Sequence, residues 1–247
     1  MRNKQAILLL FFSFAAYCLY AQDAKGDPKL TEQWDPEPEI VNPGKENHLP
    51  PSDAIILLGN NKNEFQSKNG KTNQWNFENG ILTVKPGTGN IITNESFGDC
   101  QLHIEFRTPQ MVKGEGQGRG NSGIFFMQQY ELQVLDSYNN RTYANGQAGS
   151  VYKQVAPMVN ASRGPGEWQS YDIIFTAPRF NEKGSLSSPA RITVIHNGIL
   201  IQNNTVIWGG TRFIGLPEYI KHPLKAPLEL QDHGDLVSFR NIWIRPL

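Results

Sequence analysis

Short segments in which apolar and polar residues alternate recur along the chain from about residue 54. The clearest is 101–109, QLHIEFRTP, where every second residue from Leu102 to Phe106 is apolar. Successive side chains of a β-strand point to opposite faces, so this pattern predicts a strand with one buried face. Asn-Gly pairs at 79–80 and 197–198 predict tight hairpin turns. Further strands are expected within 54–59, 75–87, 89–100, 120–138, 167–178, 190–202, 227–234 and 236–247.

No long segment shows the 3.6-residue period of an amphipathic helix, and the 23 Gly and 16 Pro residues are spread along the chain. About ten short strands joined by turns predict an all-β fold. We expect a two-sheet antiparallel β-sandwich of the jelly-roll kind.

One predicted strand carries polar residues among apolar ones. In 120–138, GNSGIFFMQQYELQVLDSY, Glu131 and Gln133 point the same way, and the apolar residues between and beside them point the other way. One face would therefore enter the core, while the other presents a carboxylate and an amide to a polar cleft. Asp136 lies an odd number of residues beyond Glu131, so a bulge or the strand end must turn it if both serve one site.

Residues 1–21 have the features of an export signal peptide. A basic start precedes an apolar stretch at 6–16, which is too short to span a bilayer. Cleavage after Ala21 would release the mature protein. Cleavage before Cys18 would instead give an outer-membrane lipoprotein, which the residues AAY before that cysteine disfavour. Either way we expect an exported protein, periplasmic or extracellular.

The mature chain is expected to have two parts. Residues 22–51 are polar and proline-rich, which predicts an extended N-terminal arm, and residues 52–247 form the sandwich. Without Cys18, Cys100 is the only cysteine, so no internal disulfide is expected. The 23 basic and 23 acidic residues form no basic stripe, so no nucleic-acid partner is expected, and no later segment suits a membrane span. The sequence does not fix the oligomeric state.

Five motifs resemble a known family. The strings GNSGIFF, YELQVLDSY, GEWQSYDI, ITVIHNG and LQDHGDLVSFRNIWIR occur in the order found in the domain of unknown function 1080 family, described as 3-keto-disaccharide hydrolase-like. The resemblance covers roughly residues 52–247. It implies a fold similar to concanavalin-like lectins and glucanases. It also implies an enzyme that cleaves glycosides or disaccharides already oxidised to a ketone at C3 of the sugar.

The implied chemistry sets requirements for the site. A ketone at C3 acidifies the C2 proton, whose removal allows the C1 substituent to leave by elimination, and water can then add at C1. Such a site needs a base, donors for the enolate oxygen, and an acid for the leaving oxygen. No cofactor is certain, although a divalent metal ion could bind the ketone oxygen as a Lewis acid.

The candidate catalytic residues are His233, Glu131 and Asp136. Histidine side chains ordinarily titrate near neutrality, and His233 lies in LQDHG at a strand end, so it is the favoured base. Glu131 could act as acid, metal ligand or acceptor for sugar hydroxyls. Asp136 could orient a histidine or cap the loop that follows. Glu131 and His233 are also the candidate metal ligands.

Polar and aromatic residues on neighbouring segments are candidates for binding substrate. The polar face of 101–109 could instead be a solvated outer face, Trp168 could be a core aromatic, and Glu131 could form a buried ion pair with Arg107 or Arg240. Lys153 falls in a loop that could cover the site. The substrate-binding candidates are Gln133, His103, Glu105, Arg107, Trp168, Gln231 and Lys153.

Two other functions fit the same fold. Lectin-like glucanases place two carboxylates on one strand in the string Glu-x-Asp-x-x-Glu. Here Gln133 replaces the middle acid and Asp136 is out of phase, which argues against a two-carboxylate glycosidase. The remaining alternative is a non-catalytic carbohydrate-binding domain, because a fold does not by itself determine a function.

Overall fold

The computed structural model describes residues 28–247, so the predicted signal peptide lies outside the described residues. The chain divides into two compact units, one ending at Ile40 and one spanning Val41–Leu247. In the first unit the described residues hold a single 3-10 turn, η1 (Pro28–Thr31). In the second unit, residues 41–51 run beside the last strand. The carbonyl oxygen of His48 there accepts hydrogen bonds from Asn241 and Trp243.

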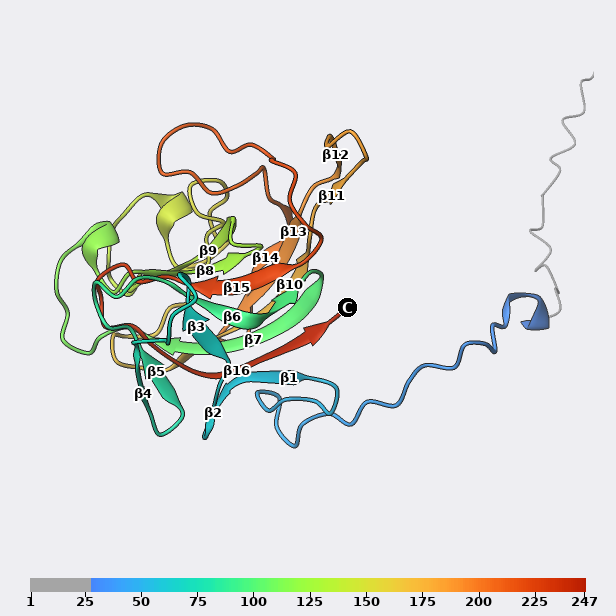
Figure 1. Cartoon of the computed structure of the whole chain (residues 1–247), viewed down its shortest axis with the longest axis horizontal. Helices are drawn as coiled ribbons and strands as arrows, with labels where there is room; N and C mark the ends of the chain where they lie inside the picture. The colour runs from blue at the N-terminus through green and yellow to red at the C-terminus, as the bar shows by residue number, and fades with distance from the viewer. Residues whose placement is uncertain (1–27) are drawn as a thin grey trace, which may run out of the picture. The chain divides into compact units, whose positions relative to one another are not determined.

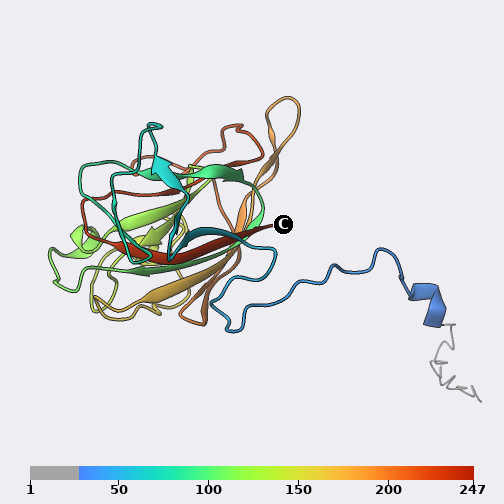
Figure 2. The same ribbon diagram turned by 60° about the horizontal axis from the view of Figure 1, so that its bottom comes forward.

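Two antiparallel sheets pack face to face in the second unit (Figures 1 and 2). Apart from η1, the only helical segments in residues 28–247 are the 3-10 turns η2 (Gly116–Gly118) and η3 (Ala144–Gly146). No helix among these residues is long and apolar enough to cross a membrane. The predicted all-β, two-sheet antiparallel sandwich is therefore confirmed.

The strands fall into a nine-stranded sheet, a five-stranded sheet and a small hairpin. The larger sheet has the order β14 (Ile199–Val206), β13 (Arg191–His196), β10 (Gln169–Thr176), β7 (Cys100–Arg107), β16 (Ser238–Pro246), β1 (Ile55–Gly59) and β2 (Lys62–Asn63), with β5 (Ile81–Thr83) pairing β16 and β4 (Asn76–Glu78) pairing β5. The smaller sheet has the order β3 (Phe65–Ser67), β6 (Ile91–Phe97), β15 (Ala226–Leu230), β8 (Ser122–Phe126) and β9 (Tyr130–Val134). The hairpin consists of β11 (Arg179–Phe180) and β12 (Leu186–Ser188).

The core lies between the two sheets and is built by the alternation seen in the sequence. Strand β7 buries Leu102, Ile104 and Phe106, and the rings of Phe126 and Phe175 stack across the sheets with centroids 4.5 Å apart. Each such side chain contributes about 1.5–3 kcal/mol when fully buried. The residues between these positions are left for the two outer faces, where a site can form.

Both Asn-Gly pairs form hairpin turns, as predicted. Asn79 and Gly80 have φ angles of 51° and 76° between β4 and β5. Asn197 and Gly198 have φ angles of 52° and 83° between β13 and β14. Two consecutive positive φ values are the geometry that makes Asn-Gly the preferred two-residue turn.

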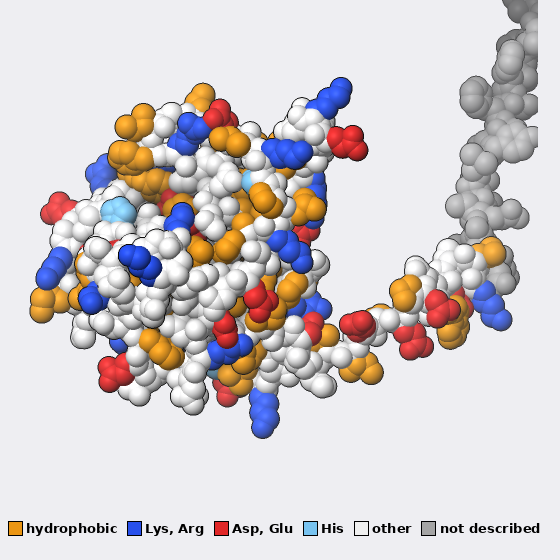
Figure 3. All heavy atoms as spheres, viewed as in Figure 1, with side chains coloured by type: hydrophobic (Ala, Val, Ile, Leu, Met, Phe, Trp, Pro, Cys, Tyr) orange, Lys and Arg blue, Asp and Glu red, His pale blue; other side chains and the backbone are white. Residues whose placement is uncertain are grey.

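Two long loops border the outer face of the five-stranded sheet. The segment 149–152 runs beside β9, because Tyr152 donates to the Glu131 carbonyl and Gly149 to the Gln133 carbonyl. The loop between β14 and β15 arches over the top of Figure 1. Thr211 joins it to β9, because the Thr211 hydroxyl accepts a hydrogen bond from the backbone of Glu131 at 3.0 Å. Hydrophobic side chains gather at the top of Figure 3, and Phe213, Ile214 and Leu216 of this loop are all exposed. The loops thus wall in one end of the smaller sheet.

Candidate functional site

A cleft of about 330 Å³ opens on the outer face of the five-stranded sheet. Strands β8, β9 and the end of β15 form its floor, and the two long loops form its sides. It brings together four of the residues singled out from the sequence, namely Glu131, Gln133, Gln231 and His233. Its other lining residues are Asn121, Phe125, Tyr152, Thr211 and Phe213.

Strand register sets the order of side chains on the floor. Glu229, Phe125 and Glu131 are direct cross-strand neighbours and form one row. In the next row Gln133 lies opposite Gly123, whose carbonyl accepts from the backbone of Gln231. Adjacent strands lie about 4.8 Å apart, so each row presents polar groups at regular intervals.

Gly123 leaves the space that the Glu131 carboxyl occupies. A Cβ atom on Gly123 would lie 2.8 Å from Oε1 of Glu131 and 2.9 Å from Cε2 of Phe125. Glycine inside a strand often marks such a close approach. The second glycine of the GNSG motif, Gly123, thus leaves room for the carboxyl of Glu131.

Changing Gly123 to Ala should therefore displace the Glu131 carboxyl. We expect any catalysis that uses the Glu131 carboxyl to fall by about 10- to 100-fold in kcat/KM, because small misplacements of a reacting group are costly. The free energy of unfolding should fall by only about 1 kcal/mol, since flexible side-chain ends can shift. Steady-state kinetics and urea unfolding would measure both. Gly118→Ala is the matched control, because its Cβ meets nothing within 4 Å. Equal losses of activity in the two variants would contradict this explanation.

The carboxyl of Glu131 is buried, with 6% of the residue exposed. Burial raises its pKa to about 8, and the nearby Glu229 carboxylate adds to the shift. With its amide oriented so that Nε2 faces Glu131, Gln133 donates a hydrogen bond of 3.1 Å to Oε1 of Glu131. Glu131 therefore carries a proton at neutral pH and can donate it inside the cleft.

Glu229, which the sequence analysis missed, is the charged neighbour of Glu131. Its carboxylate accepts from Lys68 Nζ at 2.9 and 2.8 Å and from Asn90 Nδ2 at 2.6 Å. It does not line the cleft. Its position two residues before Gln231 in PLELQDHG places both on one strand face, a signal that the alternation already contained.

Gln231 offers an acceptor that no protein group uses. Its Oε1 atom is buried without a hydrogen-bond partner, although its backbone is tied to Gly123. A buried polar atom left unpaired is costly, so a polar ligand in the cleft would find a ready acceptor. His233 follows just beyond the strand end and is exposed at the rim.

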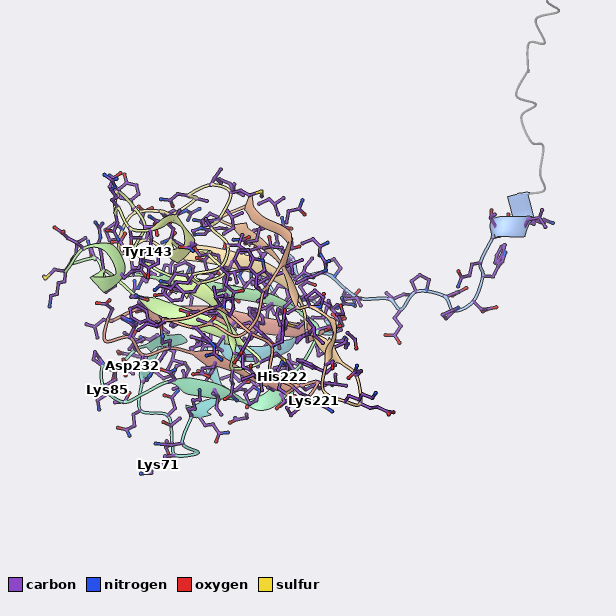
Figure 4. The ribbon with its side chains drawn as sticks, turned by 90° about the horizontal axis from the view of Figure 1, so that it is seen from above. Lys71, Lys85, Tyr143, Lys221, His222 and Asp232 are labelled. Atoms are coloured by element: carbon purple, nitrogen blue, oxygen red, sulfur yellow. The ribbon has the colours of Figure 1, made fainter. Side chains whose placement is uncertain are left out.

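Lys153 ties the two loops together at the side of the cleft. Its Nζ donates to the Phe213 carbonyl at 2.7 Å and lies 4.1 Å from the centre of the Phe213 ring. The hydroxyls of Tyr152 and Tyr143 are 2.7 Å apart. Tyr143 and Asp232 are both labelled at one end of the sandwich in Figure 4. Lys153 itself does not line the cleft, so its contact with substrate stays a prediction.

Asp136 lies outside the cleft. It forms an ion pair with Arg119 at 2.7 Å, and its Oδ1 atom accepts from the backbone of Tyr138 at 3.2 Å. It thus ends the strand and caps the following loop, one of the two roles considered for it. No bulge turns it toward Glu131, so it is not part of the mechanism proposed below.

The polar residues of β7 and Trp168 lie on the other outer face of the sandwich. His103 bonds to Asp172 at 2.6 Å, Glu105 pairs with Arg240 at 2.6 Å, and Arg107 lies over the Trp168 ring at 4.7 Å. They belong to the nine-stranded sheet, whereas the cleft belongs to the five-stranded sheet. The structure therefore does not bring these four candidates together with Glu131.

Comparisons with known proteins agree with this architecture. A sequence profile described as the 3-keto-alpha-glucoside-1,2-lyase-like domain matches residues 53–245. The chain belongs to this family. Among curated proteins, none matches the chain.

Solved structures extend the comparison. This family member is 46% identical to a proposed glycosyl hydrolase from Parabacteroides distasonis, with a TM-score of 0.86 over 91% of this chain and 98% of the other. A second proposed glycosyl hydrolase from that organism is 23% identical, with a TM-score of 0.57 over 78% of this chain and 99% of the other, and supports the fold alone. Family membership thus supports a carbohydrate-acting enzyme with a carbohydrate substrate.

The residues of the cleft do not make a complete metal site. Among residues 28–247, no three His, Cys, Asp or Glu side chains gather where they could hold a metal ion. Glu131 and His233 would be two ligands at most. A bound divalent ion usually draws on more oxygen ligands than these. The steps below therefore use only side chains of the chain.

Proposed function

We propose that this protein cleaves 3-keto-glycosides, including 3-keto-disaccharides, by elimination followed by hydration. The observation that carries the proposal is the buried Glu131 carboxyl, protonated at neutral pH, in one cleft with His233 and the unpaired Oε1 atom of Gln231. An acid and a base are two of the groups that this chemistry needs, and the Gln231 oxygen can accept a hydrogen bond from a sugar hydroxyl.

The first half of the reaction is a β-elimination. The imidazole of His233 takes the proton from C2, and the C–H electrons form an enolate with the C3 ketone. The enolate then expels the oxygen on C1, which takes the proton of Glu131 as it leaves. The products at this point are the free alcohol or sugar and a sugar with a C1–C2 double bond conjugated to the ketone.

The second half returns both groups to their starting state. Water adds to C1 and gives a proton to the Glu131 carboxylate, and the imidazolium of His233 returns its proton to C2. The sum is hydrolysis of the glycosidic bond. In this proposal Gln231 holds a sugar hydroxyl, Gln133 supports the Glu131 carboxyl from below, and the Phe213 ring at the rim offers an apolar face to the sugar.

Export to the periplasm or the cell exterior belongs to the same proposal. It rests on the sequence features of residues 1–21. No cofactor belongs to the proposal, and the chelator arm of the experiment below tests for a divalent metal ion.

The deciding experiment compares a 3-keto-glycoside with the same glycoside unoxidised, using purified protein with and without a chelator. We expect sugar release from the keto form alone. Loss of that release with chelator would add a metal to the mechanism. Cleavage of the unoxidised glycoside would instead support a two-carboxylate glycosidase, a function that the engagement of Glu229 by Lys68 and Asn90 disfavours. No cleavage over a range of linkages, with sugar binding retained, would support a lectin-like domain.

A further inference from the structure

A second cavity of about 310 Å³ adjoins the cleft and has a different character. Its apolar lining residues come from two loops, and three of them are unusually exposed for their type: Met111 at 74%, Leu236 at 53% and Val112 at 45%. Pro109 completes this wall, and the Arg119–Asp136 ion pair lies at its base. Clustered exposed apolar side chains beside a site are typical of a binding surface.

The two cavities share a boundary made of two short backbone segments. Asn121 lines the cleft and Gly120 lines the second cavity, while His233 lines the cleft and Gly234 lines the second cavity. The backbone of Asn121 donates to Oδ2 of Asp235 at 2.8 Å, which fastens the two segments to each other. Consecutive Cα atoms are about 3.8 Å apart. The linings of the two cavities therefore meet at these two segments, on the His233 side of the cleft.

Two charged side chains of the second cavity, Arg119 and Asp136, bond to each other and to the loop that follows β9. Arg119 donates through Nε to Asp136 and through a terminal nitrogen to the Tyr138 carbonyl at 3.0 Å. The Asp136 carboxylate also accepts from the Tyr138 backbone. Lys113 and Asp235 also line the cavity, but its largest exposed side chains are apolar, and an aromatic ring would cover them without displacing the Arg119–Asp136 pair.

We propose that this second cavity is the aglycone subsite, and that among 3-keto-glycosides the protein prefers those with an aromatic or similarly apolar group on C1 to those with a second sugar there. This inference rests on the proposed function, because it places the sugar beside Glu131 and the departing group beyond His233. Burial of the ring favours such substrates, and the released apolar alcohol would leave from the open side of the cavity.

The test measures binding and turnover separately. Calorimetry would compare unoxidised phenyl glucoside with methyl glucoside, and kinetics would compare the 3-keto forms of both. The variants are Leu236→Ser and Met111→Ser, with Leu224→Ser as control, since Leu224 is 62% exposed and lines neither cavity. Because leaving-group reactivity differs between the two glucosides, the quantity compared is the phenyl-to-methyl ratio in each variant.

We expect the phenyl glucoside to bind at least about tenfold more tightly than the methyl glucoside. Leu236→Ser and Met111→Ser should each lower the phenyl-to-methyl ratio severalfold in binding and in kcat/KM, and the control should leave it unchanged. Equal binding of the two glucosides, or ratios that the variants do not alter, would overturn the subsite even if 3-keto-glycosides are cleaved. Selective phenyl binding that depends on Leu236, without any cleavage, would support the subsite and reject the proposed reaction.

Discussion

Replacing Glu131 by Gln should lower kcat/KM on a 3-keto-glycoside by about 10²- to 10⁴-fold. The Glu131 carboxyl lines the cleft and is buried there. Burial and the Glu229 carboxylate raise its pKa to about 8, so it still carries a proton near neutral pH. Glutamine keeps the size and hydrogen-bonding shape of the side chain but cannot release a proton to a departing oxygen. The protein should remain folded, since the change removes an ionisable group from a buried position.

The pH dependence of activity tests the role of Glu131 as an acid independently. An acid must be protonated to act, so kcat/KM of the wild-type protein should fall as the pH rises through about 8. The residual activity of the Glu131→Gln variant should lack that alkaline limb. Kinetics between pH 6 and 9 with one 3-keto-glycoside would show both effects.

A matched control is available on another strand of the same sheet. Glu95 lies on β6 and is exposed, so Glu95→Gln makes the same chemical change away from the cleft. Its kinetics and pH profile should equal those of the wild-type protein. If Glu131→Gln retained more than about a tenth of wild-type activity, Glu131 would not be the acid and the proposed elimination would need another donor.

The sequence predicted the fold well because the alternating pattern and the turn residues act locally. The Asn-Gly pairs at 79–80 and 197–198 each require positive φ angles, and both form the expected hairpins. The same alternation placed Glu131 and Gln133 on a single strand face, and both line the cleft. Local rules were sufficient for these features, since each depends on residues close together in the chain.

The site was only partly predictable because alternation identifies a face but not the sheet that it belongs to. His103 and Glu105 show the same polar pattern as Glu131 and Gln133. Their strand, however, is in the nine-stranded sheet, so their side chains lie on the opposite outer face of the sandwich from Glu131. Thr211 and Phe213 come from a loop without any periodic pattern, so no sequence signal indicated their position beside the site. Long-range packing decides both points.

The protein should be most stable near pH 4.5–6.5 and should lose stability unusually early on the alkaline side. The folded state raises the pKa of His103 to about 9, because hydrogen bonds and charge from Asp172 and Glu105 outweigh a burial effect in the opposite direction. This histidine therefore stabilises the fold fully below pH 6.5, and that contribution is lost as the pH rises toward 9.

Glu131 acts in the same direction over an overlapping range. Its folded pKa of about 8 lies above the ordinary value of 4.5, so the folded protein holds a proton that the unfolded chain releases. The stability associated with that proton declines from pH 4.5 to 8. Between pH 6.5 and 8 both residues contribute, and each proton changes the free energy of unfolding by up to about 1.4 kcal/mol per pH unit. The combined slope approaches about 3 kcal/mol per pH unit.

The acid side has the opposite sign. Burial lowers the pKa of His196 to about 3, so stability rises with pH between 3 and 6.5 and offsets the Glu131 slope above 4.5. Glu105, whose pKa is lowered to about 2, adds a further rise with pH below 4.5. Its own burial opposes this shift, but hydrogen bonds from His103, Asn241 and Arg240 outweigh it. Cys100 enters only above pH 9, where burial keeps its thiol protonated in the fold.

Urea unfolding at half-unit steps from pH 5 to 8.5 would measure these slopes directly. Glu131→Gln and His103→Gln should each remove about half of the decline between pH 6.5 and 8, whatever their effect on absolute stability. Because the two side chains lie on different sheets, their slopes should add in the double variant. A wild-type stability that stays level from pH 6.5 to 8 would show that neither proton is held by the fold. For Glu131 that outcome would also remove the acid on which the proposed reaction depends.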